Sequence, residues 1–239
     1  MNTIKEQQVG NYKVKVVYDE DAENPREWDD LFTIYSNHRR INPDGHTIEE
    51  LEDENGQVNI DGKFGLMIWL YEHSGYAFKT TELEASNPFG NGIYARFDSG
   101  QFGIIAAPID ELKRRLGDNW ETEAKQLAEN EIKTFNQYAN GEVFAYRICD
   151  NDGDVVSSCG DWYDVEEALK EGIAEAKQII ENNKNEVEEL LEDATFDELK
   201  SKFYELAQSA PIWVDDLFEL IDEDKAREWL KKKLREMVE

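Results

Sequence analysis

The chain has 239 residues and carries 54 Asp and Glu against 26 Lys and Arg, a formal net charge of −28 at pH 7. This excess argues against direct binding of DNA, RNA or an anionic membrane, because those contacts need clustered Lys and Arg. Hydrophobic residues make up 40% of the chain and aromatic residues 11%, too many for a disordered acidic tail, so we expect a folded protein.

The N-terminal quarter predicts one strand followed by two acidic stretches. Polar and β-branched residues alternate over 12–18, which is typical of a strand. The run from Asp19 to Asp30 holds seven carboxylates, and its Pro25 indicates a short helix. Residues 42–63 predict a loop or a short exposed helix. Three arginines lie beside these acidic stretches, where we expect internal ion pairs, with ligand binding as the alternative: Arg26, Arg39 and Arg40.

The centre of the chain has the pattern of short antiparallel strands joined by glycine turns. Strands are predicted at 64–71, 76–81, 93–97 and 102–106, with turns at 73–75 and 98–100. Helices at 109–116 and 121–139 follow. The second helix spaces its apolar residues for one buried face, and Gly141 ends it.

A second hairpin and a run of helices complete the chain. The hairpin strands are predicted at 142–149 and 155–159, and helices at 163–181, 186–192, 196–208, 212–221 and 223–237. Thr195 with Glu198 fits a capping box. The basic cluster from Lys231 to Arg235 is interpreted as complementing the dipole of the last helix.

These elements predict an α+β fold, with an antiparallel sheet and packed helices followed by a helical C-terminal extension. We place an acidic α+β domain at 1–182 and a helical region at 183–239. Cys149 and Cys159 are expected to be reduced thiols. The polar N-terminal stretch, and the lack of about 18 uninterrupted apolar residues anywhere, favour a cytoplasmic protein.

The sequence assigns no catalytic residue, metal or cofactor. The loop from Asp150 to Asp161 fails as a calcium site, because Val155 stands where the loop needs glycine, so a β-turn is expected. The three histidines lack Cys or His partners at metal-ligand spacing. A thiolate nucleophile from Cys149 or Cys159 with His73 as its base is conceivable, but no local signature supports it.

The candidate partner-binding residues are carboxylates outside the nearly neutral centre. Residues 61–120 carry a net charge of −2, whereas 1–60, 121–180 and 181–239 carry −8, −9 and −9. The candidates are Asp19, Glu20, Asp21, Glu23, Glu49, Glu50, Glu52, Asp53, Glu54, Glu167, Glu171, Glu175, Glu188, Glu189 and Glu192.

Three of these candidates, Glu167, Glu171 and Glu175, share one helical row. If 164–192 formed one helix, its net −7 would give one charge per about 6 Å, against one per about 1.7 Å in duplex DNA. Imitation of DNA therefore needs a second acidic row. The alternative interpretation is a solvated helix face.

Several motifs occur in an order that resembles a family of uncharacterised acidic proteins encoded by phages and plasmids. They are AENPREWD at 22–29, HRR at 38–40, YEHSG at 71–75, DSGQFG at 98–103 and EIKTFNQY at 131–138. The resemblance covers about 12–180. The family has no assigned reaction. The resemblance implies a gene carried by mobile DNA, where acidic proteins often block restriction or CRISPR enzymes.

Charge and resemblance together predict an anti-defence protein of the host cytoplasm that binds a host defence protein with a basic cleft, with DNA mimicry and a homodimer left open. No nucleic acid or membrane is expected as a direct partner. The alternative is an assembly module in which the C-terminal helices pack through Phe196, Leu199, Phe203, Leu206, Trp213, Leu217, Leu220, Trp229 and Leu230. A hydrolase that uses Cys or His is the third hypothesis.

Overall fold

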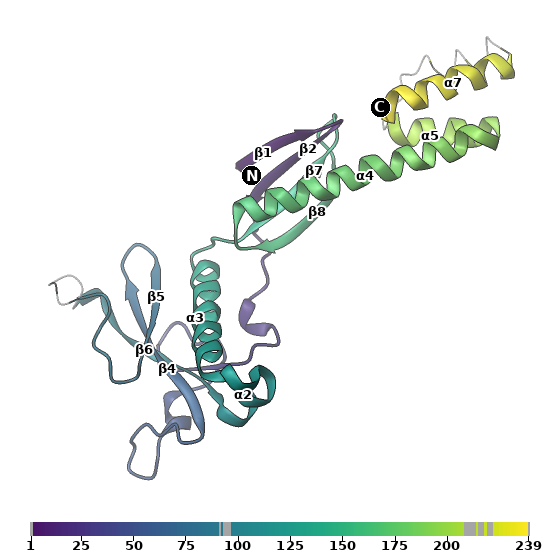
Figure 1. The fold of residues 1–239 in the computed structure, drawn as a ribbon. Helices are drawn as coiled ribbons and strands as arrows, with labels where there is room; N and C mark the ends of the chain where they lie inside the picture. The colour runs from purple at the N-terminus through teal and green to yellow at the C-terminus, as the bar shows by residue number, and fades with distance from the viewer. Residues whose placement is uncertain are drawn as a thin grey trace. The chain divides into compact units, whose positions relative to one another are not determined.

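The computed structural model describes residues 2–90, 92, 97–207, 214, 218 and 222–238 (Figure 1). It confirms an α+β fold, with two four-stranded sheets where one was predicted. The chain forms two compact units. Unit 1 is built from 1–2, 17–145 and 160–165, and unit 2 from 3–16, 146–159 and 166–239. The units are therefore interleaved in sequence, which differs from the predicted division at residue 183.

The sheet of unit 1 is antiparallel. Its strands in spatial order are β3 (Thr33–Ser36), β6 (Ser99–Pro108), β4 (Lys63–Glu72) and β5 (Tyr76–Thr81). Three of them confirm predicted strands, whereas β3 was not predicted. The turn predicted at 98–100 is wrong, because Ser99 and Gly100 already pair with β4. Positions 93–96 of the strand predicted at 93–97 lie outside the described residues.

Two helices, α2 (Ile109–Leu116) and α3 (Trp120–Ala139), pack on one face of this sheet and confirm the predicted helices. Alternate residues of β4 point to opposite faces of the sheet. Leu66 and Ile68 belong to the core under the helices, whereas Met67 packs in a second cluster with Ile104 on the other face. Gly141 ends α3 with a φ of 69°, a conformation that favours glycine.

Two short 3-10 helices precede β4: η1 (Pro25–Glu27) and η2 (Ile48–Leu51). The first confirms the short helix predicted at Pro25, and the side chain of Asn24 caps it by accepting a hydrogen bond from the Arg26 N–H. The second lies within the stretch predicted as a loop or short helix. Its Leu51 is buried against Ile104, so η2 covers part of the second face of the sheet.

The second sheet has the strand order β1 (Thr3–Val9), β2 (Tyr12–Tyr18), β7 (Phe144–Cys149) and β8 (Val155–Trp162). It confirms the predicted strand at 12–18 and the second hairpin, whereas β1 was not predicted. Strands β2 and β7 are neighbours although residues 19–143 separate them in sequence. Cys149 is buried and Cys159 is exposed, and neither forms a disulfide bond with another described residue.

One long helix, α4 (Val165–Asp193), replaces the two helices predicted at 163–181 and 186–192. It packs closely on the sheet at Gly172, where a Cβ atom would lie 2.7 Å from Val14 and 2.9 Å from Tyr146. The predicted break at 182–185 is wrong because Ile180 and Val187 continue the apolar stripe through it. Tertiary packing thereby overrides the modest helix propensity of asparagine.

The helices α5 (Phe196–Ala207) and α7 (Glu223–Val238) pack with the end of α4 around the buried side chains of Val187, Leu199, Phe203, Leu230 and Leu234. Glu198 and Thr195 form the predicted capping box. The helix predicted at 212–221 lies largely outside the described residues, and so do Trp213, Leu217 and Leu220. In the described part of the chain, no helix has the length and apolar character needed to span a membrane.

We expect Gly103→Ala to destabilise the protein by about 1–3 kcal/mol, the usual cost of overpacking. A Cβ atom at Gly103 would overlap the backbone carbonyl of Tyr35 and force β3 away from β6. Urea unfolding measures the change. Gly100→Ala in the same strand is the control, because a Cβ atom there meets nothing within 4 Å. Equal stability of the two variants would contradict this account of the strand contact.

Candidate functional site

The fifteen acidic candidates belong to two different units. The nine at 19–23 and 49–54 lie in unit 1, and the six at 167–192 lie in unit 2 on α4. In each set, some carboxylates make hydrogen bonds that hold the local fold together, and others project into solvent.

The segment 19–23 combines one structural carboxylate with exposed ones. Asp19 is half-buried and accepts a hydrogen bond from the backbone N–H of Asp161 at 2.9 Å. The Asp161 carboxylate in turn accepts one from the Glu23 N–H at 2.8 Å. Asp19 thus joins two distant segments, and its role at a partner surface stays a prediction. Glu20, Asp21 and Glu23 have exposed side chains.

In the segment 49–54, three carboxylates have local roles. Glu50 accepts hydrogen bonds from His46 and from the Thr47 N–H, and these bonds lower the pKa of its carboxyl. Asp53 accepts from the backbone N–H groups of Gln57 and Asn55, which lowers its pKa as well. Glu49 binds Asn37. Glu52 and Glu54 are exposed and project from this loop.

On α4, the row predicted from spacing does not stay on one surface. The carboxylate of Glu175 accepts hydrogen bonds from the Tyr146 hydroxyl and, at 2.6 Å, from the Ser157 hydroxyl. The pKa of Tyr146 is raised above its ordinary value, mainly by burial and secondly by the hydrogen bond to this carboxylate and its charge. Glu175 therefore joins helix and sheet, whereas Glu167 and Glu171 are exposed. The partner-binding role of all three stays a prediction.

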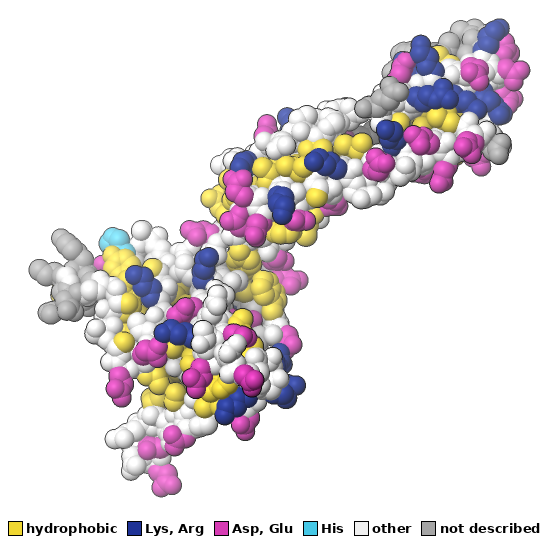
Figure 2. All heavy atoms as spheres, in the orientation of Figure 1, with side chains coloured by type: hydrophobic (Ala, Val, Ile, Leu, Met, Phe, Trp, Pro, Cys, Tyr) yellow, Lys and Arg dark blue, Asp and Glu magenta, His cyan; other side chains and the backbone are white. Residues whose placement is uncertain are grey.

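The exposed candidates on α4 gather at its two ends. Glu167 and Glu171 lie near the N-terminus, and the group from Glu188 to Glu192 lies near the C-terminus. Residues 171 and 188 are about 26 Å apart along the helix axis. Figure 2 shows Lys and Arg side chains interspersed with Asp and Glu along α4 and the C-terminal helices. Because Glu175 is turned toward the sheet, the exposed net charge of α4 is sparser than one per about 6 Å.

Two basic residues of α7 bind backbone carbonyls at the C-terminal end of α4 and just after it. Lys231 donates a hydrogen bond to the carbonyl of Leu191 at 2.8 Å, and Arg227 to that of Ala194 at 3.3 Å. The basic cluster of α7, interpreted from the sequence as complementing its own helix, therefore also complements the C-terminal end of α4. These contacts fix α7 against α4.

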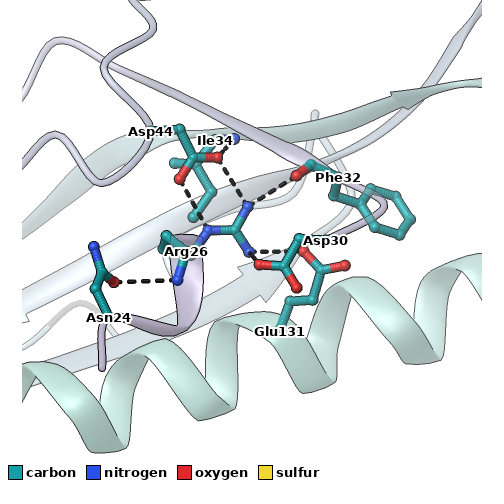
Figure 3. A network of polar contacts seen from close by, with 7 residues as sticks. All are labelled: Asn24, Arg26, Asp30, Phe32, Ile34, Asp44 and Glu131. Carbon is teal, nitrogen blue, oxygen red and sulfur yellow. Dashed lines mark hydrogen bonds and ion pairs between the residues drawn. The ribbon is translucent and has the colours of Figure 1, made fainter. Parts of the chain in front are cut away.

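Arg26 is the centre of the most connected polar cluster in the described part of unit 1 (Figure 3). Its side chain is only 2% exposed. The guanidinium binds Asp44 in a bidentate manner at 2.9 and 2.8 Å and donates to Glu131 at 2.8 Å. It also pairs with Asp30 at 2.6 Å and donates to the Phe32 carbonyl at 2.8 Å.

This cluster is a closed structural site, because every ionic group in it is paired within the protein. Asp44 also accepts a hydrogen bond from the Ile34 N–H in β3, so the cluster links η1, β3 and α3. Burial raises the pKa of Glu131 to about 7, although Arg26 acts in the opposite direction. Burial likewise raises the pKa of Asp30. Burial disfavours the charge of Arg26, but its bonds to Asp44 and Glu131 outweigh this and raise the pKa of the guanidinium.

The ion pairs predicted for the three arginines are confirmed for two. Arg26 has three carboxylate partners, and Arg40 pairs with Glu72. Arg39 is exposed and makes no ion pair with another described residue. The sequence analysis did not identify the partners of Arg26. Asp30 and Asp44 lie within the two acidic stretches, but no local signal points to Glu131, which is 105 positions away.

The turn at 150–154 and the surroundings of His73 bear on the calcium, metal and thiolate sites considered from the sequence. Asp150 accepts hydrogen bonds from three consecutive backbone N–H groups at 152–154, which confirms the predicted β-turn. His73 lies 3.5 Å from Asp98, and it belongs to a different unit from Cys149. Over the described residues, no group of three or more His, Cys, Asp or Glu side chains is placed to hold a metal ion.

Comparison with known proteins finds no matching family model, no matching curated protein and no matching solved structure. The resemblance to acidic proteins of phages and plasmids therefore stays a prediction from the sequence motifs.

We expect Arg26→Met to destabilise the protein by about 3–5 kcal/mol, because it leaves three carboxylates in a buried site without their cation. Denaturant unfolding at neutral pH measures the change. Arg114→Met is the matched control, because Arg114 is exposed and its one ion-pair partner among the described residues is Glu111 on its own helix. A loss for Arg26→Met no larger than that for the control would show that the cluster is not structural.

Glu131 also predicts a pH dependence. The pKa of Glu131 is 4.5 in the unfolded chain, its ordinary value, and about 7 in the folded protein. Between pH 4.5 and pH 7 the folded state therefore binds more protons than the unfolded state does. The free energy of unfolding therefore falls by up to about 3 kcal/mol as pH rises through this window. Glu131→Gln should remove this fall, whereas the exposed control Glu129→Gln should keep it. Parallel pH profiles for the wild type and Glu131→Gln would refute the prediction.

Proposed function

We propose that this chain is an anti-defence binding protein that inhibits a nucleic-acid-directed host enzyme, of restriction or CRISPR type, by occupying its basic cleft. The observation that carries the proposal is the long helix α4. Its 29 residues include ten Asp and Glu and three Lys, and all of its candidate carboxylates except Glu175 are exposed. A second set of exposed carboxylates lies on the loops of unit 1, at 20–23 and 52–54.

The spacing of this charge favours electrostatic complementarity over a copy of the phosphate positions. Over the roughly 26 Å between Glu171 and Glu188, α4 adds only Glu181 and Glu186 as exposed carboxylates, far fewer than one charge per about 1.7 Å in duplex DNA. Complementary charge accelerates encounter with a basic surface and repels nucleic acid, even without matched phosphate positions. We therefore propose that each acidic end of α4 contacts a separate basic patch of the enzyme's cleft.

The alternative of an assembly module has less support from the described residues. Its anchors Phe196, Leu199 and Phe203 pack in the internal core of the C-terminal helices together with Trp229 and Leu230. Side chains used in this way do not offer an apolar surface to a partner. The remaining anchors at 213, 217 and 220 lie outside the described residues. The homodimer and the host cytoplasm stay predictions from the sequence.

The test uses a panel of purified restriction and CRISPR nucleases, with cleavage and complex formation measured between about 50 and 200 mM salt. We expect inhibition by the wild type that weakens as salt rises. We expect roughly tenfold weaker binding from a triple variant that combines Glu171→Gln, Glu188→Gln and Glu189→Gln. This is the effect expected from the loss of three exposed ion pairs. Circular dichroism verifies that the variant is folded.

The matched control carries the same change in charge on α3 of unit 1: Glu121→Gln, Glu123→Gln and Glu129→Gln. All three side chains are exposed. We expect the control to inhibit as well as the wild type does. Equal losses for both variants would show that net charge acts without a specific surface, and the absence of any salt-sensitive complex across the panel would reject the proposal.

A further inference from the structure

Unit 1 contains a concave site on the face of its sheet opposite α2 and α3. The cavity has a volume of about 350 Å³. Met67 of β4 and Ile104 of β6 contribute apolar side chains, and Ile48 of η2 and Val58 of the segment after it add apolar groups. Arg39 and Gln101 also line the site. An apolar pocket with a few polar groups at its edge is typical of a small-molecule site.

Hydrogen bonds to neighbouring segments hold the walls of this pocket. The Ser36 hydroxyl donates to the Phe102 carbonyl at 2.7 Å, which fixes the end of β3 to β6. The side-chain amide of Asn37 accepts from the Ile48 N–H at 2.9 Å and donates to Glu49 at 3.0 Å. These bonds join the segment that carries Arg39 to η2, which carries Ile48. The pocket is therefore formed before a ligand binds.

Arg39 has the chemistry to recognise an anion. It makes no ion pair with another described residue, whereas the adjacent Arg40 pairs with Glu72. Among the described residues, which include most of the chain's Asp and Glu, no carboxylate pairs with Arg39 at the edge of this apolar pocket, so its guanidinium is available for a ligand. A guanidinium binds a carboxylate through two parallel hydrogen bonds.

We propose that this pocket binds a small amphipathic monocarboxylate, whose apolar body contacts Met67 and Ile104 and whose carboxylate binds the Arg39 guanidinium. The volume is near the lower limit of ligand pockets, about 300–1,000 Å³, and suits a single ring or a medium alkyl chain. The Gln101 amide donates a further hydrogen bond to the carboxylate. This site is independent of the acidic surface of α4.

The probe is 4-phenylbutyrate, titrated into the full chain labelled with carbon-13 at its methionine methyl groups. The chain has three methionines, so the Met67 signal is readily assigned, and Met237 of unit 2 serves as an internal control. We expect a saturable shift of the Met67 signal alone. Arg39→Gln should raise Kd about tenfold or more, as expected for the loss of a charge-assisted hydrogen bond.

Two controls separate the guanidinium from general charge. Arg114→Gln makes the same change in charge on α2 and should leave Kd unchanged. The uncharged 4-phenylbutanamide should bind the wild type more weakly and be insensitive to Arg39→Gln. Val58→Trp, at an exposed wall position, should fill the pocket and abolish the Met67 shift. The absence of a saturable Met67 shift up to the solubility of the probe, or an equal effect of Arg39→Gln and Arg114→Gln, would overturn the proposal.

Discussion

The buried charge of Arg26 is the interaction on which the organisation of unit 1 depends. A guanidinium that is removed from water must be paired, and the chain supplies carboxylates from the segment after η1, from the loop before η2 and from α3. Through Asp44 the cluster also binds the backbone of β3 at Ile34. Strand β3 leads directly into the segment that carries Arg39. The pocket on the second face of the sheet therefore depends on the Arg26 cluster, which lies on the side of α3.

The acidic side chains behind the net charge of −28 therefore fall into two groups. Part of it is used inside the fold, at Asp44 and Glu131 around Arg26, at Asp19 beside Asp161, and at Glu175 between helix and sheet. The rest projects from two loops of unit 1 and from the ends of α4. The proposed anti-defence role rests on this outward fraction.

Local periodicity was enough to predict much of the fold, whereas features set by distant contacts were not accessible. Strand β4 and helix α3 have clear apolar periods. Strand β1 is an edge strand with mostly exposed polar side chains and has no such period. Spacing alone placed Glu175 in a row with Glu171, because the helix pattern does not reveal which edge meets Tyr146. The pairing of Arg26 with Glu131 depends on tertiary packing alone.

The interleaving of the two units gives this chain a constraint on its order of folding. Strands β2 and β7 are neighbours in one sheet, but β7 is synthesised only after nearly all of unit 1. Closing so long a loop between unfolded ends costs roughly 4 kcal/mol or more in entropy. Within unit 1, the Asp19 N–H donates to the Val143 carbonyl at 2.9 Å, which brings those ends together. Once unit 1 has folded, this contact holds the end of β2 near the start of β7. The pairing of these two strands then no longer requires the closure of a long flexible loop.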